Sequence, residues 1–460
     1  MASSPLIAFY GDDFTGSTDA LEVLAATGLK SILFVDVPTP ETLARFEGLE
    51  AIGIAGSSRS LTPEEMCEVI PPVLAALKQT DAPILHYKVC STFDSSPTIG
   101  SFGRVMDIAQ AELGRSTIPI VVGAPKLARY SFFGTLFARH NVDGTVHRIN
   151  RHPTMSVHPT TPMREADMRL HIGAQTSQNI ALLPAPAIAQ SDGEATAALD
   201  AALATDPDAL LLDLVDQEAE PEVGALLGRM AERRSPLFVL GSSGVEYALV
   251  AAWRAAGRLP VVAPRMTAGP VDRLFVISGS CSPATGAQIA SAIRNGFAEV
   301  ALDPVKLMIE GADGVYAAQV VADIARMLDD GRSVVAHSST GPTDPREALV
   351  STHLRSQGLT GEAGRIQGGR ALAAAAGVLL DQVLRRVKLS RFVVAGGDTS
   401  TAAIKKLGID ALEMVAPLYR GAPLCRALAP GRELHGRELV LKGGQMGGPD
   451  FFLQAKAGRA

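Results

Sequence analysis

One repeated pattern limits what this chain can fold into: a short apolar run ends in a glycine- or serine-rich turn, and a helical pattern follows. Such runs lie at residues 6–9, 31–36, 50–54, 84–89, 118–122, 209–214 and 237–240, and again at 273–277, 333–336, 392–395 and 439–441. Helical patterns of about 10–15 residues separate several of them. This alternation is typical of βαβ units that build a mostly parallel sheet.

The length and one proline-rich segment predict two domains. A chain of 460 residues with 47% hydrophobic residues is too long for a single core. Residues 259–270 hold three prolines and a glycine, and a new apolar run follows at once. We therefore expect an α/β protein with domains at residues 1–262 and 270–460. Each would have a mostly parallel sheet flanked by helices, with the active site in the interdomain cleft.

Charge, hydropathy and cysteine spacing exclude several classes of protein. A net charge of −6 argues against a general nucleic-acid binder. The sequence has no 18-residue uncharged apolar run and no basic-then-apolar amino terminus, so we expect a cytoplasmic protein without membrane association. The four cysteines are scattered without a CxxC pair, so neither a disulfide framework nor a zinc site is suggested. Neither a GxxxxGK(S/T) loop nor a GxGxxG fingerprint occurs.

Two adjacent carboxylates follow the first apolar run. In the segment LIAFYGDDFTGSTD, Asp12 and Asp13 stand where a buried strand ends, and a helical pattern begins near Asp19. Ligands of open α/β sheets collect at this end of the strands. Because neighbouring carboxylates repel each other, a site that keeps both usually offers cations, hydroxyls or backbone donors. The alternative is a polar turn in which one Asp caps the helix.

Two further polar segments of the first half suit a small, anionic, hydroxylated ligand. Lys88 ends an apolar run, and Ser91 and Thr92 lie in the hydrogen-bonding turn that follows it. Arg151 lies in an irregular proline-rich loop, residues 147–163, whose length is typical of functional or disordered loops. The histidines of this loop lack the helical HxxxH spacing and could ligate a metal or contact an anion or substrate.

In the second half, four predicted strands end in small-residue turns, at residues 278–280, 337–342, 396–400 and 442–445. Turns of this kind before helices expose backbone N–H groups, and the helix dipole favours an anion there. Together they predict a phosphate-binding edge, although each could also be an ordinary tight turn. Asp398 is the carboxylate inside this edge. It could hold Mg²⁺ or approach a transferred phosphoryl group, or it could cap the helix that follows.

These motifs carry a family resemblance. GDDFTGSTD, YKVCSTFDSS, RHPTMSVHPTTPM, SGSCSPAT, GGDTST and KGGQMG, in this order, resemble the four-carbon acid sugar kinase family over residues 6–452. The resemblance is strongest to its 3-oxo-tetronate branch, because the threonate and erythronate branches tend to carry Arg-Gly where this chain has Asp94 and Ser95. It implies ATP-dependent phosphorylation of the terminal (4-) hydroxyl of a four-carbon ketonic sugar acid. The amino-terminal domain would hold the sugar acid and the carboxyl-terminal domain ATP with Mg²⁺.

The resemblance and the residue patterns together assign candidate site residues. The sugar acid would contact Asp12, Asp13, Lys88, Ser91, Thr92 and Arg151. ATP would contact Ser280, Ser338, Gly341, Gly396, Gly397, Asp398, Thr399, Gly443 and Gly444. Asp12, Asp13 and Asp398 are the candidates for the proton acceptor, and we expect the largest effect at Asp13. Apart from the possibility that Asp398 holds Mg²⁺, no residue is assigned as a metal ligand. A homodimer is expected only because it is the commonest oligomer of soluble proteins.

Three alternatives stay open at this stage. The substrate could be threonate, erythronate or a related branched oxo sugar acid. The chain could also be another nucleotide-dependent enzyme, such as a ligase, or an oxidoreductase, which the missing dinucleotide fingerprint disfavours. A non-catalytic sensor of nucleotide or sugar acid would use the same residues without turnover.

Overall fold

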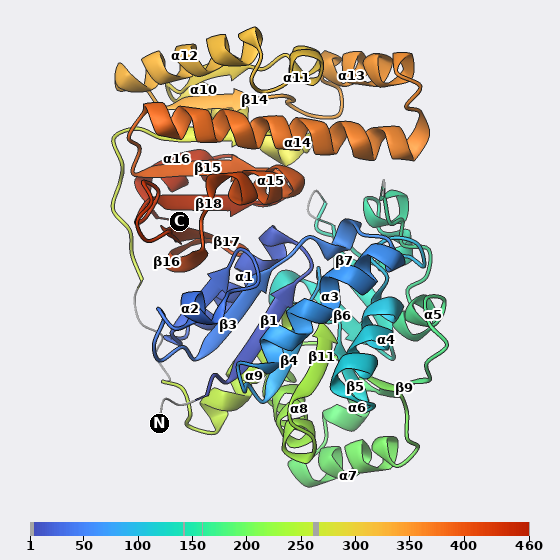
Figure 1. Cartoon of the computed structure of the whole chain (residues 1–460). Helices are drawn as coiled ribbons and strands as arrows, with labels where there is room; N and C mark the ends of the chain where they lie inside the picture. The colour runs from blue at the N-terminus through green and yellow to red at the C-terminus, as the bar shows by residue number, and fades with distance from the viewer. Residues whose placement is uncertain (1–3, 141–142, 159, 261–265, 460) are drawn as a thin grey trace. The chain divides into compact units, whose positions relative to one another are not determined.

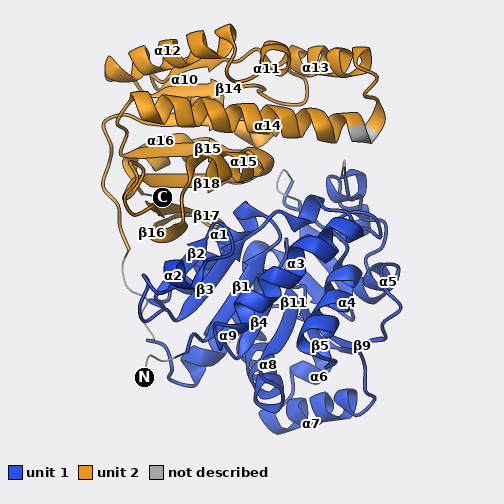
Figure 2. Cartoon of the chain, in the orientation of Figure 1, with its two compact units in different colours: residues 1–264 blue, residues 265–460 orange. Residues whose placement is uncertain are grey.

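The computed structural model describes residues 4–140, 143–158, 160–260 and 266–459. The chain forms two compact units, residues 1–264 and 265–460, which Figure 2 shows in blue and orange. The predicted end of the first domain at residue 262 falls on residues 261–265, and these lie outside the described residues, as does Pro159 of the proline-rich loop.

Unit 1 contains a parallel sheet with the strand order β2-β3-β1-β4-β11-β5-β10-β9. Its strands are β1 (Ile7–Gly11), β2 (Ser31–Phe34), β3 (Ala51–Ala55), β4 (Ile84–Lys88), β5 (Ile118–Val121), β9 (Ile180–Leu183), β10 (Ala209–Leu212) and β11 (Leu237–Gly241). A small antiparallel sheet is formed by β6 (Arg129–Phe132), β7 (Thr135–Arg139) and β8 (Val146–Arg148). The central strands are fully buried, as continuous apolar runs predict for a sheet covered on both faces.

The helices of unit 1 begin at recognisable caps. They are α1 (Phe14–Ala25), α2 (Pro40–Leu43), α3 (Pro63–Lys78), α4 (Phe102–Leu113), α5 (Met168–Gly173), α6 (Ala185–Ile188), α7 (Asp192–Leu203), α8 (Glu220–Arg233) and α9 (Gly244–Ala255), with 3₁₀ turns η1 (Ser58–Ser60), η2 (Pro125–Leu127), η3 (Ile149–Arg151) and η4 (Met155–Val157). Thr62 and Glu65 form a capping box in front of α3. Asp13 caps α1, so this helix begins at Phe14, earlier than the predicted start near Asp19. Helices α3 and α4 pack together, as do α8 and α9 (Figure 1).

Unit 2 contains a mixed sheet with the strand order β13-β14-β12-β15-β18-β17-β16. Its strands are β12 (Phe275–Ser278), β13 (Ala298–Ala301), β14 (Val334–His337), β15 (Arg391–Ala395), β16 (Ala411–Tyr419), β17 (Ala422–Leu428) and β18 (Glu438–Lys442). Only β17 runs antiparallel to its neighbours, β16 and β18, among the strands described. The prediction of two α/β domains with mostly parallel sheets is therefore confirmed, whereas the hairpin of β16 and β17 was not predicted.

Helices cover the unit 2 sheet and complete its core. They are α10 (Pro283–Arg294), α11 (Pro304–Glu310), α12 (Val315–Asp329), α13 (Pro345–Ser356), α14 (Gly361–Arg386), α15 (Gly397–Leu407) and α16 (Phe451–Ala457). The buried core includes Val276, Val335 and Val440 from the strands and Phe451 and Phe452 from α16. The long α14 runs beside α12, and both contact the sheet (Figure 1). Among the helices of the described residues, none has the length and apolar character needed to cross a membrane.

Candidate functional site

In unit 1, several predicted site residues follow strands that end at the same level. The register pairs Gly11 with Ala55 on one side and with Lys88 on the other, and Lys88 also pairs with Gly241. The backbone N–H of Asp12 donates to the Lys88 carbonyl at 2.9 Å. Segments that are distant in the sequence thus meet at the carboxyl edge of this sheet, the edge at which open α/β sheets bind ligands.

Arg59, from η1 after β3, joins the two adjacent carboxylates. Its guanidinium lies 3.2 Å from Asp12 Oδ1 and 2.5 Å from Asp13 Oδ2. The Asp12 side chain is 2% exposed, while those of Asp13 and Arg59 are 18% and 28% exposed, so the latter two are open to a ligand. Burial raises the pKa of Asp12 to about 6, against the opposing charge of Arg59. Asp13 therefore fits both interpretations of the motif, because it caps α1 and also belongs to a charged cluster.

Lys88 is buried beneath this cluster and is paired inside the protein. Its Nζ lies 3.5 Å from Asp19 Oδ2, which also accepts a hydrogen bond from the Ser243 hydroxyl. Burial would lower the pKa of Lys88, but the charges of Asp19 and Glu246 outweigh it and raise the pKa. Since Lys88 is 1% exposed, its first role in this structure is to neutralise Asp19.

The turn after β4 adds a third carboxylate near Arg59. Asp94 accepts hydrogen bonds from Thr92 Oγ1 at 2.5 Å and from Thr161 Oγ1 at 3.0 Å. Burial raises the pKa of Asp94, but the charge of Arg59 leads the opposing effects and leaves that pKa below its usual range. Ser91 is half-buried in the same turn. Arg151 is exposed at the end of η3, and no hydrogen bond or ion pair of the described residues joins it to the cluster.

The histidines of the proline-rich loop are held by local contacts. His152 Nδ1 accepts from the backbone N–H groups of Thr154 and Met155, and its ring lies among those of His140 and His147. His158 Nδ1 accepts from the N–H of Thr161 at 3.1 Å. Within the described ranges, no group of three or more His, Cys, Asp or Glu side chains is arranged to hold a metal ion.

In unit 2, four strands also end in one row. The register aligns Ser278 with His337 and with Ala395, and Ala395 with Lys442. The loops after β12, β14, β15 and β18 therefore leave the sheet at one edge, which we call the unit 2 rim (residues 278–282, 338–344, 396–400 and 443–447). Both α10 and α15 begin at this rim, so their N-terminal N–H groups lie there.

Close backbone approaches bring these loops together around Ser280. A Cβ built on Gly444 would lie 2.7 Å from Ser280 Oγ, and one on Gly279 would lie 2.3 Å from Thr399 Oγ1. Gly396 has a φ of 117°, a conformation that favours glycine, and a Cβ there would lie 3.1 Å from Thr399 Oγ1. At Gly279, Gly396 and Gly444, the close packing of one loop on another thus leaves little room for a side chain.

The remaining predicted residues of the rim differ in how open they are. Gly397 begins α15, and a Cβ built on it meets nothing within 4 Å. Asp398 is exposed in the first helical turn, whereas the helix cap is Gly396, so Asp398 is not the cap. The N–H of Ser338 donates to the Ser278 carbonyl, and that of Gly341 donates to Ser339 Oγ. Gly443 is half-buried and accepts from the N–H of Met446.

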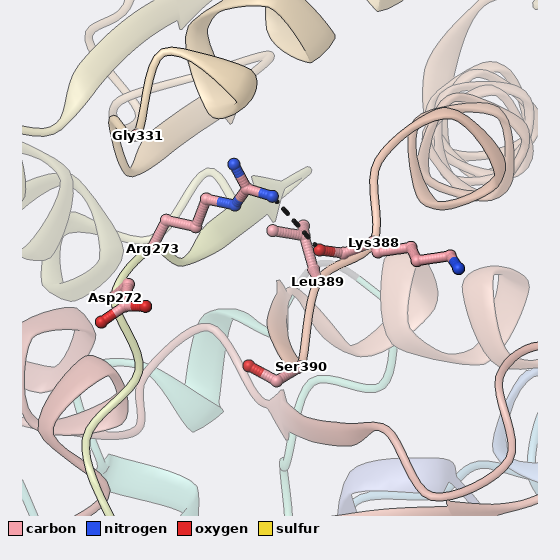
Figure 3. Close-up of a pocket in the computed structure, with 6 residues that line it drawn as sticks. All are labelled: Asp272, Arg273, Gly331, Lys388, Leu389 and Ser390. Atoms are coloured by element: carbon pink, nitrogen blue, oxygen red, sulfur yellow. Dashed lines mark hydrogen bonds between the residues drawn. The ribbon is translucent and has the colours of Figure 1, made fainter.

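A hollow of about 650 Å³ lies at the other end of the unit 2 strands. Figure 3 shows Arg273, which precedes β12, donating to the Lys388 carbonyl at 3.4 Å, with Ser390 before β15 nearby. These residues stand at the amino ends of the strands. The hollow is therefore separate from the unit 2 rim, and it contains none of the predicted site residues.

Family comparisons match both units. Residues 7–249 match the family described as "Sugar-binding N-terminal domain", and residues 275–452 match "Nucleotide-binding C-terminal domain". The chain belongs to the four-carbon acid sugar kinase family. The predicted family resemblance is confirmed. Membership of a kinase family makes the chain a phosphotransferase.

Individual relatives of this kinase family cover nearly the whole chain. The 3-oxo-isoapionate kinase of Paraburkholderia graminis is 44% identical, over 99% of this chain and 94% of the relative. The 3-oxo-tetronate kinase of Methylobacterium radiotolerans is 30% identical, over 96% of this chain and 97% of the relative. A crystal structure of a Salmonella typhimurium LT2 protein has the same fold, with a TM-score of 0.73 and 24% identity over 98% of both chains.

Sequence reasoning did not single out Arg59, the residue whose guanidinium pairs with both Asp12 and Asp13. A signal was present, because the polar turn GSSRS follows β3 in the same way that the predicted site segments follow their strands. The segment lacked a carboxylate or a glycine pair, and its proximity to Asp12 arises only from the pairing of β3 with β1.

Proposed function

We propose that this protein transfers the terminal phosphoryl group of ATP to the terminal hydroxyl of a 3-oxo sugar acid. The observation that carries the proposal is the 44% identity with a 3-oxo-isoapionate kinase over 99% of the chain. The relative named for 3-oxo-tetronate is more distant, at 30% identity. We therefore place 3-oxo-isoapionate first among the substrates and 3-oxo-tetronate, which the sequence motifs favour, second.

The nucleotide is assigned to the unit 2 rim. The open position at Gly397 and the N-termini of α10 and α15 suit phosphate oxygens that approach the backbone closely. Asp398, exposed at this rim, is the carboxylate that would hold Mg²⁺ together with the phosphates, since Mg²⁺ prefers one or two carboxylates plus phosphate oxygens. The ion would neutralise phosphate charge during transfer.

The sugar acid is assigned to the cluster of Arg59, Asp12 and Asp13. Arg59 keeps an exposed face, which can bind the substrate carboxylate or a ketone oxygen by charge-assisted hydrogen bonds. In the reaction, the substrate hydroxyl oxygen bonds to the terminal phosphorus, the bond to the ADP oxygen breaks, and a carboxylate receives the hydroxyl proton. Asp12 and Asp13 are the acceptors proposed for that proton, and the nearby Lys88 is held by its ion pair with Asp19.

The test is an ADP-release assay with ATP and a panel of acids: 3-oxo-isoapionate, 3-oxo-tetronate, threonate and erythronate. We expect the highest kcat/KM with one of the two 3-oxo acids. Turnover restricted to threonate or erythronate would contradict the 3-oxo assignment. ATP binding without turnover on any acid would favour a sensor.

A further inference from the structure

Lys442, the last residue of β18, is a fully buried lysine at the unit 2 rim. Its Nζ donates a hydrogen bond to Thr285 Oγ1 at 2.9 Å and lies 3.5 Å from the Gly444 carbonyl oxygen. Thr285 Oγ1 donates in turn to that carbonyl at 2.8 Å. Since Thr285 lies in the first turn of α10, the ammonium group connects β18, α10 and the glycine turn that follows β18.

The buried lysines at the strand ends of the two units differ in their charged partners. Lys88 in unit 1 has Asp19 as an ion-pair partner. For Lys442, no carboxylate of the residues that the structure describes lies within ion-pair distance, and Nζ lies 5.8 Å from the centroid of the Phe451 ring. Burial alone lowers the pKa of Lys442 to about 7. A buried cation without a counter-charge is unfavourable, so this lysine opposes stability unless something else supplies the negative charge.

The position of Lys442 indicates where that charge comes from. The Gly396 N–H donates to the Lys442 carbonyl at 2.9 Å, so the ends of β15 and β18 are joined at this residue. The turn above it brings Gly444 against Ser280. We infer that Lys442 is a positioning residue whose positive charge complements the phosphate chain of a nucleotide at the unit 2 rim and holds the Gly443–Gly444 turn for it. The inference rests on the proposed function and adds to it a residue that was not among the candidate site residues predicted from the sequence.

The test compares ligands that differ only in their number of phosphates. Calorimetry would give Kd for ATP, ADP and adenosine with the wild-type chain, Lys442→Met, and the control Lys406→Met, which removes an exposed lysine near the end of α15. For Lys442→Met we expect ATP binding to weaken by about 10- to 100-fold, ADP binding to weaken less, and adenosine binding to stay unchanged. The melting temperature without nucleotide should stay equal or rise, because an uncompensated buried charge is removed.

Three other outcomes would contradict the inference. A purely structural role would lower the melting temperature and weaken all three ligands equally. Unchanged ATP affinity in Lys442→Met, with a wild-type chain that binds ATP, would overturn the inference alone. A wild-type chain that does not bind ATP would overturn the proposed function and the inference with it. If Lys442→Met does not fold, Lys442→Gln takes its place, because the amide keeps a donor for Thr285 without the charge.

Discussion

Gly397 offers the sharpest test of the proposed nucleotide site, because stability and binding should change in opposite directions. Its φ is not in the left-handed region, and a Cβ there meets nothing within 4 Å, so alanine fits the folded chain. A Gly→Ala change at such a helical position stabilises by about 0.4–1 kcal/mol through the unfolded state. At about 2–4 °C per kcal/mol, the melting temperature of Gly397→Ala should rise by about 1–4 °C.

The same methyl group should weaken ATP binding. It would occupy the space through which phosphate oxygens approach the N–H groups at the start of α15, and a hydrogen bond to a charged group is worth about 1.5–3 kcal/mol. The Kd for ATP should therefore increase about 10- to 100-fold in Gly397→Ala and further in Gly397→Val.

Calorimetry and thermal unfolding of the same samples would measure both effects. Gly369→Ala is a matched control, since Gly369 is exposed in α14 of the same unit and its Cβ position is also open. The control should gain stability and keep its ATP affinity. Unchanged ATP affinity in a folded Gly397→Val protein would refute the placement of phosphate at this rim.

Four further predictions concern unit 1. Lys88→Met leaves Asp19 buried without an ion-pair partner, so the free energy of unfolding measured in denaturant should fall by about 3–5 kcal/mol. Adding Asp19→Asn should recover most of this loss. A Lys88→Met protein of wild-type stability would contradict the ion pair. If Asp12 accepts the proton, wild-type kcat/KM should rise with pH through about 6 as its carboxyl ionises, and Asp12→Asn should remove this limb and lower kcat about 10²–10⁴-fold. Because the pKa of Asp12 is raised from 3.8, the folded state loses stability as pH rises from about 4 to about 6, and Asp12→Asn should abolish this loss. If the free energy of unfolding changed with pH equally in both proteins, the raised pKa would be contradicted. Asp13→Asn should lower kcat about 10²–10⁴-fold with little change in melting temperature, because the amide oxygen can still accept from the Gly16 N–H. Near-wild-type turnover in both Asp12→Asn and Asp13→Asn would leave Asp398 as the candidate proton acceptor.

The parallel strands and their small-residue turns could be predicted from the sequence because their causes are local. A fully buried parallel strand reads as a continuous apolar run, and a glycine after it marks the turn whichever strand becomes its neighbour. The hairpin of β16 and β17 was missed because residues 411–428 do not form such a run. Several side chains of β16 are only half-buried or exposed, so its strand character depends on pairing with β17.

The tertiary structure decided which charged side chains pair with each other at the candidate site. Lys88 and Lys442 look alike in the sequence, since each is a lysine that ends an apolar strand before a polar or glycine-rich turn. One has Asp19 beside it and the other has no carboxylate partner among the described residues, and this difference follows from which helix packs over each strand end. Arg59 likewise reaches Asp12 and Asp13 only because β3 pairs with β1. The sequence by itself determined the kinds of residue at the strand ends, because burial and turn formation act over a few neighbouring residues. Only the folded chain decided which charges meet, because electrostatic pairing depends on distances between segments far apart in the sequence.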